Sequence, residues 1–138
     1  MSPTFNRILA IISGLILGSA FNWLFLEVGG FIIPPPAGTD LSTMEGLKSA
    51  LPFFEPKHFL FPFLAHAVGT LTGALFATMI AKTKQRGMSM IIGILFLIGG
   101  IINVVMLPSP IWFSVTDLLL AYIPMAYLGY SIGMKFKK

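Results

Sequence analysis

The sequence predicts an all-α membrane protein whose single domain, residues 1–138, is an antiparallel bundle of four transmembrane helices. Of its 138 residues, 56% are hydrophobic and only 10% are charged. A soluble domain of this length has roughly a quarter of its residues charged, so the composition indicates that a lipid bilayer is the main solvent. Four long apolar runs, with basic residues confined to their ends, support the same conclusion.

Each apolar run is long enough to cross the hydrocarbon layer, which takes about 20 residues of α-helix. The runs contain neither Lys nor Arg and cover residues 8–26, 59–81, 88–107 and 111–134. Only short connecting segments separate the last three runs. Because lipid does not tolerate unpaired backbone groups, we expect consecutive antiparallel helices joined by tight turns.

Basic residues predict the orientation, because cytoplasmic segments of membrane proteins are enriched in Lys and Arg. With the N-terminus inside, seven of the nine basic residues lie on the inner side: Arg7, Lys82, Lys84, Arg86, Lys135, Lys137 and Lys138. Only Lys48 and Lys57 fall in the outer loop. We therefore expect both termini in the cytoplasm and a location in a bacterial inner (plasma) membrane. The basic residues form no continuous face, which argues against a nucleic-acid partner.

The outer loop, residues 28–57, is too long for a simple turn, and we expect it to contain structure. The segment Ser42–Glu45 matches a capping box and predicts a short helix with Ser42 as its cap. Within that helix Met44, Leu47 and Leu51 share one face. We therefore expect this helix to lie on the outer membrane surface or over the bundle.

Prolines mark further features of the chain. Pro34–Pro36 favours a stiff polyproline segment in the outer loop. Glu55 followed by Pro56 is typical of a helix start and predicts where the second span begins. Pro62 and Pro124 lie inside spans, where each removes a backbone hydrogen bond, so we expect both helices to bend.

Each predicted span carries one strongly polar side chain at a similar depth: Asn22, His66, Asn103 and Asp117. At ~1.5 Å per helical residue, all four lie roughly 6 to 12 Å below the outer surface. Polar groups inside a bilayer normally face the bundle interior, where they can pair. We therefore predict a polar layer that can bind a ligand. In it, Asp117 and His66 lie within hydrogen-bonding or single-water reach, with Asn22 or Asn103 nearby.

Three further polar residues, Glu27, Glu55 and His58, are expected at the mouth of this region. Glu55 and His58 have a spacing that two metal ligands on one helix can use. His66 lies about 12 Å deeper than His58, which is too far for a shared ion. A capping carboxylate and an interfacial histidine explain the pair more simply. Because cysteine is also absent, we expect no metal site and no cofactor.

Small residues recur four positions apart on three of the spans: Gly14 and Gly18; Ala65, Gly69, Gly73 and Ala77; Gly129 and Gly133. Such GxxxG-like stripes let backbones approach closely in lipid, where the hydrophobic effect no longer drives helices together. We expect them to pack within the bundle, and a stripe left over could form a homo-oligomer contact.

Three functions remain open, because the sequence does not reveal a substrate. The first is binding or transport of a small solute, ion or lipid in the outer-half polar pocket. The second is a structural or accessory subunit whose polar layer only fixes helix packing. A membrane enzyme is third: Ser19 and Ser114 lie near the polar layer, but no nucleophile motif accompanies them, so we expect no catalytic residue.

Overall fold

The computed structural model describes residues 1–137, and every regular element within them is a helix. The elements are α1 (Pro3–Ile32), α2 (Met44–Ala50), η1 (Leu51–Phe53), η2 (Pro56–Phe59), α3 (Leu60–Ile80), α4 (Gln85–Met106), α5 (Ile111–Leu120) and α6 (Ile123–Phe136). η1 and η2 are 3-10 helices. Lys138, counted above among the basic residues, lies outside the described residues.

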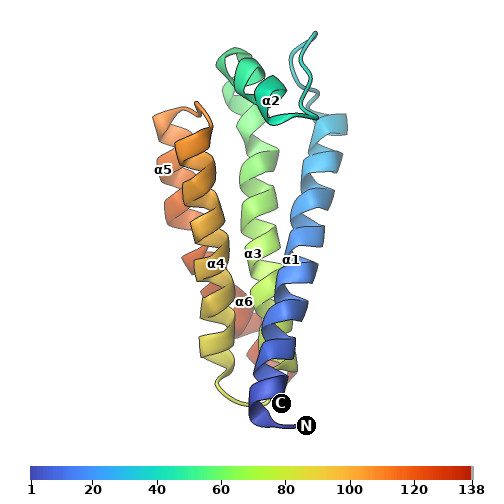
Figure 1. Cartoon of the computed structure of the whole chain (residues 1–138), viewed down its shortest axis with the longest axis vertical. Coiled ribbons are helices and arrows are strands. Elements are labelled where there is room, and N and C mark those ends of the chain that lie inside the picture. Colours follow the sequence, from blue (N-terminus) through green and yellow to red (C-terminus); the bar gives the residue numbers. More distant parts are fainter. Residues whose placement is uncertain (138) are drawn as a thin grey trace.

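Four helical segments of the described chain are long and apolar enough to cross a membrane: Pro3–Ile32, Pro56–Ile80, Gln85–Met106 and Ile111–Phe136. The predicted all-helical architecture with four membrane-length helices is therefore confirmed. Figure 1 shows both chain ends at one end of the bundle, here called the termini end. The opposite end, which carries α2, is called the loop end.

The first helix, α1, is longer than predicted at both ends. It begins directly after Ser2, whose side chain caps the first turn, and it continues to Ile32. The helix therefore continues past residue 28, where the outer loop was expected to begin. Gly29 lies inside this helix and packs against Phe61, with which a Cβ at this position would collide.

The helix α3 is central, because it contacts α1, α4 and α6. Its approach to α1 is close, since glycines of the two helices face each other. A Cβ on Gly14 would lie 2.7 Å from the Gly73 carbonyl oxygen, and a Cβ on Gly18 would lie 2.7 Å from that of Gly69. On another side of α3, a Cβ on Gly133 of α6 would lie 2.9 Å from the Thr78 side chain. Larger residues at these positions would force the helices apart.

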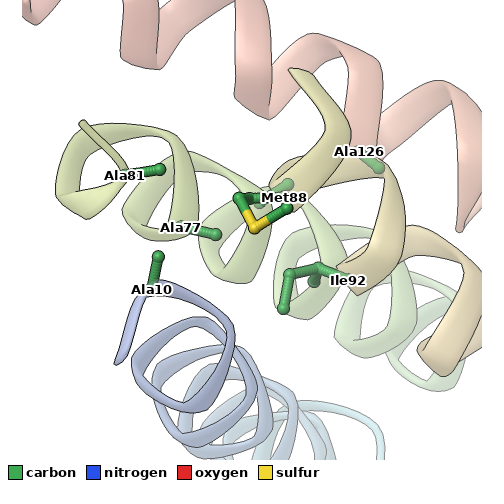
Figure 2. Close-up of a cluster of buried hydrophobic side chains, with 7 residues drawn as sticks. Ala10, Ala77, Ala81, Met88, Ile92 and Ala126 are labelled. Carbon is green, nitrogen blue, oxygen red and sulfur yellow. The ribbon is translucent and has the colours of Figure 1, made fainter. Parts of the chain in front are cut away.

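Small side chains fill the bundle toward the termini end, as Figure 2 shows. The buried cluster consists of Ala10, Ala74, Ala77, Ala81, Met88, Ile92 and Ala126. Ala10 of α1 points toward Ala77 of α3, and Met88 and Ile92 of α4 lie nearby. Alanine loses no rotamer freedom on burial, so close packing here costs little side-chain entropy.

The connection between α3 and α4 is held by Asn6, a residue that the sequence analysis did not single out. Asn6 is 2% exposed. Its Nδ2 donates to the Ile80 carbonyl oxygen at 3.0 Å, and its Oδ1 accepts from the Lys82 amide at 2.7 Å. Lys84 then precedes α4 with a φ of 55°, a left-handed conformation that is uncommon outside glycine. Asn6 thereby ties the first helix to the end of α3.

The fourth span breaks between α5 and α6, and the bend predicted near Pro124 is confirmed. Leu120 ends α5 and Ile123 begins α6. Proline has no N–H to donate to the preceding turn, which explains the break. Pro62, in contrast, lies in the first turn of α3, directly after the 3-10 turn η2. Helices tolerate proline there because the first-turn N–H groups have no intrahelical partner.

The helix predicted in the outer loop is present as α2, and it lies over the loop end of the bundle (Figure 1). Its cap is Thr43, whose Oγ1 accepts from the Gly46 amide at 3.0 Å, so the predicted cap at Ser42 was wrong. The Ser42 amide and hydroxyl instead donate to Asp40 Oδ1 at 2.9 and 2.6 Å. This turn makes Thr43 the residue that precedes the helix. The same two hydrogen bonds hold the pKa of Asp40 below its ordinary value of 3.8.

Aromatic packing anchors this loop to the spans beneath it. Leu51 of η1 is buried against Phe59 of η2 and Phe113 of α5. The Phe59 ring centroid lies 4.8 Å from that of Phe113 and 5.6 Å from that of Trp112. We call α2 with η1, Met44–Phe53, the lid. These contacts connect the lid to the second and fourth spans.

Replacing Thr43 by Ala should destabilise α2 by about 1 kcal/mol, because the cap acceptor is lost. Ser42→Ala is the matched control. It retains the cap but removes the hydroxyl donor to Asp40, so the pKa of Asp40 should rise toward 3.8. Amide hydrogen exchange across α2 measures the first effect, and NMR titration of the Asp40 carboxyl measures the second.

The direction of the pH effect follows from the lowered pKa. Because Asp40 is more acidic in the folded loop, its interaction with Ser42 stabilises the loop above the ordinary pKa of 3.8. That contribution is lost as the pH falls through the lowered value.

Faster exchange of α2 in Ser42→Ala than in Thr43→Ala would contradict the assignment of the cap.

Candidate functional site

A cavity of about 420 Å³ lies beneath the lid at the loop end of the bundle. Apolar side chains form most of its wall, among them Leu26, Met44, Leu47, Leu51, Phe54 and Phe61. Its polar side chains include Glu27, Lys57, His58, His66, Asn103 and Asp117. The predicted apolar face of the loop helix therefore points into this cavity, over the bundle. The size and the mixture of many apolar and few polar groups are typical of small-molecule sites.

The predicted pair of His66 and Asp117 is confirmed. The His66 Nδ1 atom lies 2.8 Å from Asp117 Oδ1. The Tyr122 hydroxyl donates to the other carboxylate oxygen, Oδ2, at 2.9 Å. Asp117 is only 3% exposed, so both of its oxygens are partnered while the side chain is shielded from lipid. Two donors offset part of the cost of burying this carboxyl group in a membrane.

The same pair determines what His66 presents to a ligand. When Asp117 is ionised and the His66 ring is neutral, Nδ1 carries the hydrogen and Nε2 is an acceptor; in a protonated ring Nε2 is a second donor. No group among residues 1–137 hydrogen-bonds to Nε2, and the His66 side chain is 19% exposed and lines the cavity. In its neutral form His66 therefore offers an oriented acceptor to a bound molecule.

Sequence reasoning missed Tyr122, because an unbroken helix would not bring it to Asp117. Residues five apart in an α-helix point about 140° away from each other. The break before Ile123 changes this direction and lets Tyr122 reach back. Gly100 of α4 provides the room: a Cβ there would lie 2.5 Å from the Tyr122 hydroxyl oxygen. Pro124 was the available signal, but proline reports a bend and not its direction.

The two predicted asparagines lie on opposite sides of a second cavity. This cavity, of about 310 Å³, lies between α1 and α4, with α3 as its floor. Asn22 of α1 and Asn103 of α4 line it together with His66. The expectation that an asparagine lies near the His66–Asp117 pair is thus confirmed. His66, Gly100 and Asn103 line both cavities, so the two spaces adjoin.

The three residues expected at the pocket mouth have different roles. Glu27 lies on α1, and both Glu27 and His58 line the cavity beneath the lid. Glu55 does not line it, and its exposed carboxylate lies 3.4 Å from Nζ of Lys57, which does. His58 Nδ1 accepts from the Glu55 amide at 2.9 Å, and Nε2 lies 3.1 Å from the Pro34 carbonyl oxygen. His58 therefore ties the polyproline segment to the start of the second span.

The same side chains bear on whether the site could hold a metal ion or a side-chain nucleophile. Within residues 1–137, no group of three or more His, Cys, Asp or Glu side chains could hold a metal ion. In that same part of the chain, no serine or threonine hydroxyl hydrogen-bonds to the His66 ring. Thr70 Oγ1 donates instead to the His66 backbone carbonyl at 2.8 Å.

Replacing Gly100 by Ala should lower stability by about 1 to 3 kcal/mol, because the displaced Tyr122 leaves an Asp117 oxygen without its donor. Gly99→Ala is the matched control, since a Cβ there meets nothing within 4 Å. Thermal unfolding in detergent micelles measures both. Tyr122→Phe should cost a similar amount, and its combination with Gly100→Ala should be less than additive. Equal melting temperatures for the two alanine variants would refute the proposed dependence on Gly100.

Comparison of the chain with known protein families, curated proteins and solved structures finds no match.

Proposed function

We propose that this chain is a small integral membrane protein that binds a small amphipathic solute within the bundle. The observation that carries the proposal is the cavity beneath the lid. Its wall is mainly apolar, and it contains the oriented acceptor Nε2 of His66 together with the Asn103 amide. The polar end of the solute binds at His66, and its apolar part lies under the lid against Leu47 and Leu51.

The site favours a polar end that donates hydrogen bonds. Nε2 of His66 accepts, and Asp117 lies directly behind the ring with 2.8 Å between the paired atoms. A hydroxyl or an ammonium group satisfies this arrangement, whereas a carboxylate would face a nearby like charge. Glu27 in the same cavity adds a further negative group, and the positive charge of Lys57 there is paired with Glu55 at 3.4 Å. We therefore propose an alcohol or amine as the preferred class of solute.

Binding is better supported than a continuous aqueous path. The polar residues of the site gather toward the loop end, whereas the termini end contains a closely packed cluster that includes Ala77, Met88 and Ile92. An open pore needs polar or water-accessible lining along its whole length. Any transport would therefore require a change in helix packing at the termini end.

The proposed orientation is an antiparallel bundle with the loop end outside and both termini in the cytoplasm of a bacterium. It is supported by the basic residues of the termini end, Arg7, Lys82, Lys84, Arg86, Lys135 and Lys137, against Lys48 and Lys57 at the loop end. In this orientation the cavity lies in the outer half of the inner membrane.

The competing proposal is an accessory subunit in which the polar layer only fixes helix packing. Its support is that Asp117 is already satisfied by His66 and Tyr122, two side chains of the same chain. Interhelical hydrogen bonds of this kind contribute about 0.6 kcal/mol on average. Such a subunit would need a partner, and a homo-oligomer is one form of that proposal.

The orientation is tested with single cysteines, which the natural chain lacks. Ser49→Cys on the lid and Thr83→Cys between α3 and α4 are both exposed positions. A membrane-impermeant maleimide added to intact cells should label only Ser49→Cys, and Thr83→Cys should react only after permeabilisation. Labelling of both variants from outside would overturn the orientation.

Binding is tested on the full chain in lipid nanodiscs with diazirine-bearing octylamine and the matching octanol. Both probes should crosslink to lid residues, as mapped by mass spectrometry. Leu47→Trp should abolish this labelling by filling the cavity. Ile16→Trp, at a position that is 63% exposed on α1 and does not line the cavity, should leave it unchanged. Absence of lid labelling with both probes would favour the accessory subunit.

Asp117→Asn separates the two proposals further. An asparagine at this position carries no charge, whether its Oδ1 accepts from His66 Nδ1 or its Nδ2 donates to it. Octylamine binding should therefore fall about tenfold or more, in line with the ~1.5–3 kcal/mol of a hydrogen bond to a charged group. Octanol, which is uncharged, should lose less. A purely structural layer predicts equal changes for both probes.

A further inference from the structure

The cleft between α1 and α4 is lined by Ser19, Asn22, Gly99, Ile102 and Asn103, and its polar wall lies in the loop-end half of two membrane-length helices. In Figure 1, α1 and α4 separate toward the loop end, and α3 is visible between them. Phe96 lies at the narrow end, where a Cβ on Gly18 would be 2.8 Å from its ring.

Three polar side chains of this cleft, those of Ser19, Asn22 and Asn103, lack partners within the described chain. Among residues 1–137, no hydrogen bond involves the side chains of Ser19, Asn22 or Asn103. Asn103 is exposed and Asn22 half-buried. An amide in an apolar environment is unfavourable without a hydrogen bond. A polar group that passes through or stays in the cleft would relieve that cost.

The lid covers only part of the loop-end side of the cavity. Met44 and Leu47 of the lid lie over it, and apolar packing of Leu51 holds the lid, but the exposed side chains of Glu27 and Lys57 also line this side. The cleft on the α1–α4 side opens between two membrane-length helices, and the unpartnered amides lie there.

We infer that the cleft between α1 and α4 is a lateral portal through which a single-chain amphipath enters from the surrounding lipid. Asn22 and Asn103 bind its head group in turn and pass it to His66, which lines both the cleft and the cavity. This inference rests on the proposed binding function and adds the source of the solute. The ligand is a membrane-dissolved alcohol or amine with one hydrocarbon chain, rather than a water-soluble compound.

The test compares matched tryptophan substitutions on each wall of the cleft. Ser19→Trp on α1 blocks the cleft, and Ala20→Trp is its control, because both residues are exposed but only Ser19 lines the cleft. Ile102→Trp and Ile101→Trp form the second pair on α4, at positions 51% and 46% exposed. Circular dichroism and thermal unfolding identify any variant that fails to fold, and two independent pairs keep the test decisive.

The measurement is the yield of lid crosslinks after brief mixing of proteoliposomes with vesicles that carry diazirine-bearing octanol. Ser19→Trp and Ile102→Trp should lower this yield roughly tenfold, the lower end of the range by which association rates vary among related complexes. The two control variants should behave as the natural chain. After long incubation all variants should reach similar yields, because the block affects access and not the site.

Three results would overturn the portal. In the first, cleft and control variants label at equal rates while the lid of the natural chain is labelled, so the solute reaches the cavity by another route. In the second, probe added from water labels the lid faster than probe delivered in vesicles. In the third, the lid of the natural chain is not labelled at all, and the proposed binding function fails with it. The first two leave that function intact, so the failures are distinguishable.

Discussion

A carboxylate inside a membrane bundle needs hydrogen-bond donors for its oxygens, and this requirement at Asp117 shapes the loop half of the molecule. One donor comes from His66 on α3, and the other comes from Tyr122 beyond the break in the fourth span. The second donor depends on two further residues. Pro124 breaks the helix so that Tyr122 can turn back, and Gly100 leaves space for its ring. Residues of α3, α4 and α5 and the break before α6 therefore meet around one carboxyl group.

The two halves of the bundle are packed differently, and this difference produces the cavity. Toward the termini end, alanines and facing glycines let α1 and α3 approach until backbone atoms nearly touch. Lipid provides no hydrophobic driving force between helices, so this contact relies on close van der Waals packing. Beyond Phe96 the helices α1 and α4 separate, and larger aromatic side chains and the lid surround the remaining space.

Polar groups in the membrane region fall into two sets, and the distinction carries the functional argument. Asp117 and the Nδ1 atom of His66 are satisfied by residues of the same chain, so their pairing is compatible with a purely structural role. The Nε2 atom of His66 and the amides of Asn22 and Asn103 have no partner within residues 1–137, although all three residues line cavities. A structural layer has no need for these groups, whereas a binding site does.

Sequence alone determined the features that depend on distance along one helix: the four membrane-length runs, the single polar residue in each, the apolar face of Met44, Leu47 and Leu51, and the bend near Pro124. Bilayer thickness and helical periodicity set these features, and both can be counted in a sequence.

Only the tertiary structure decided the features that depend on the rotation of one helix against another. They are the Tyr122 hydrogen bond, the Asn6 tie to the end of α3 and the cleft between α1 and α4. The physical reason is that a hydrogen bond between distant segments depends on directions that a helix break or a turn changes by a large angle. Residue spacing does not record that angle.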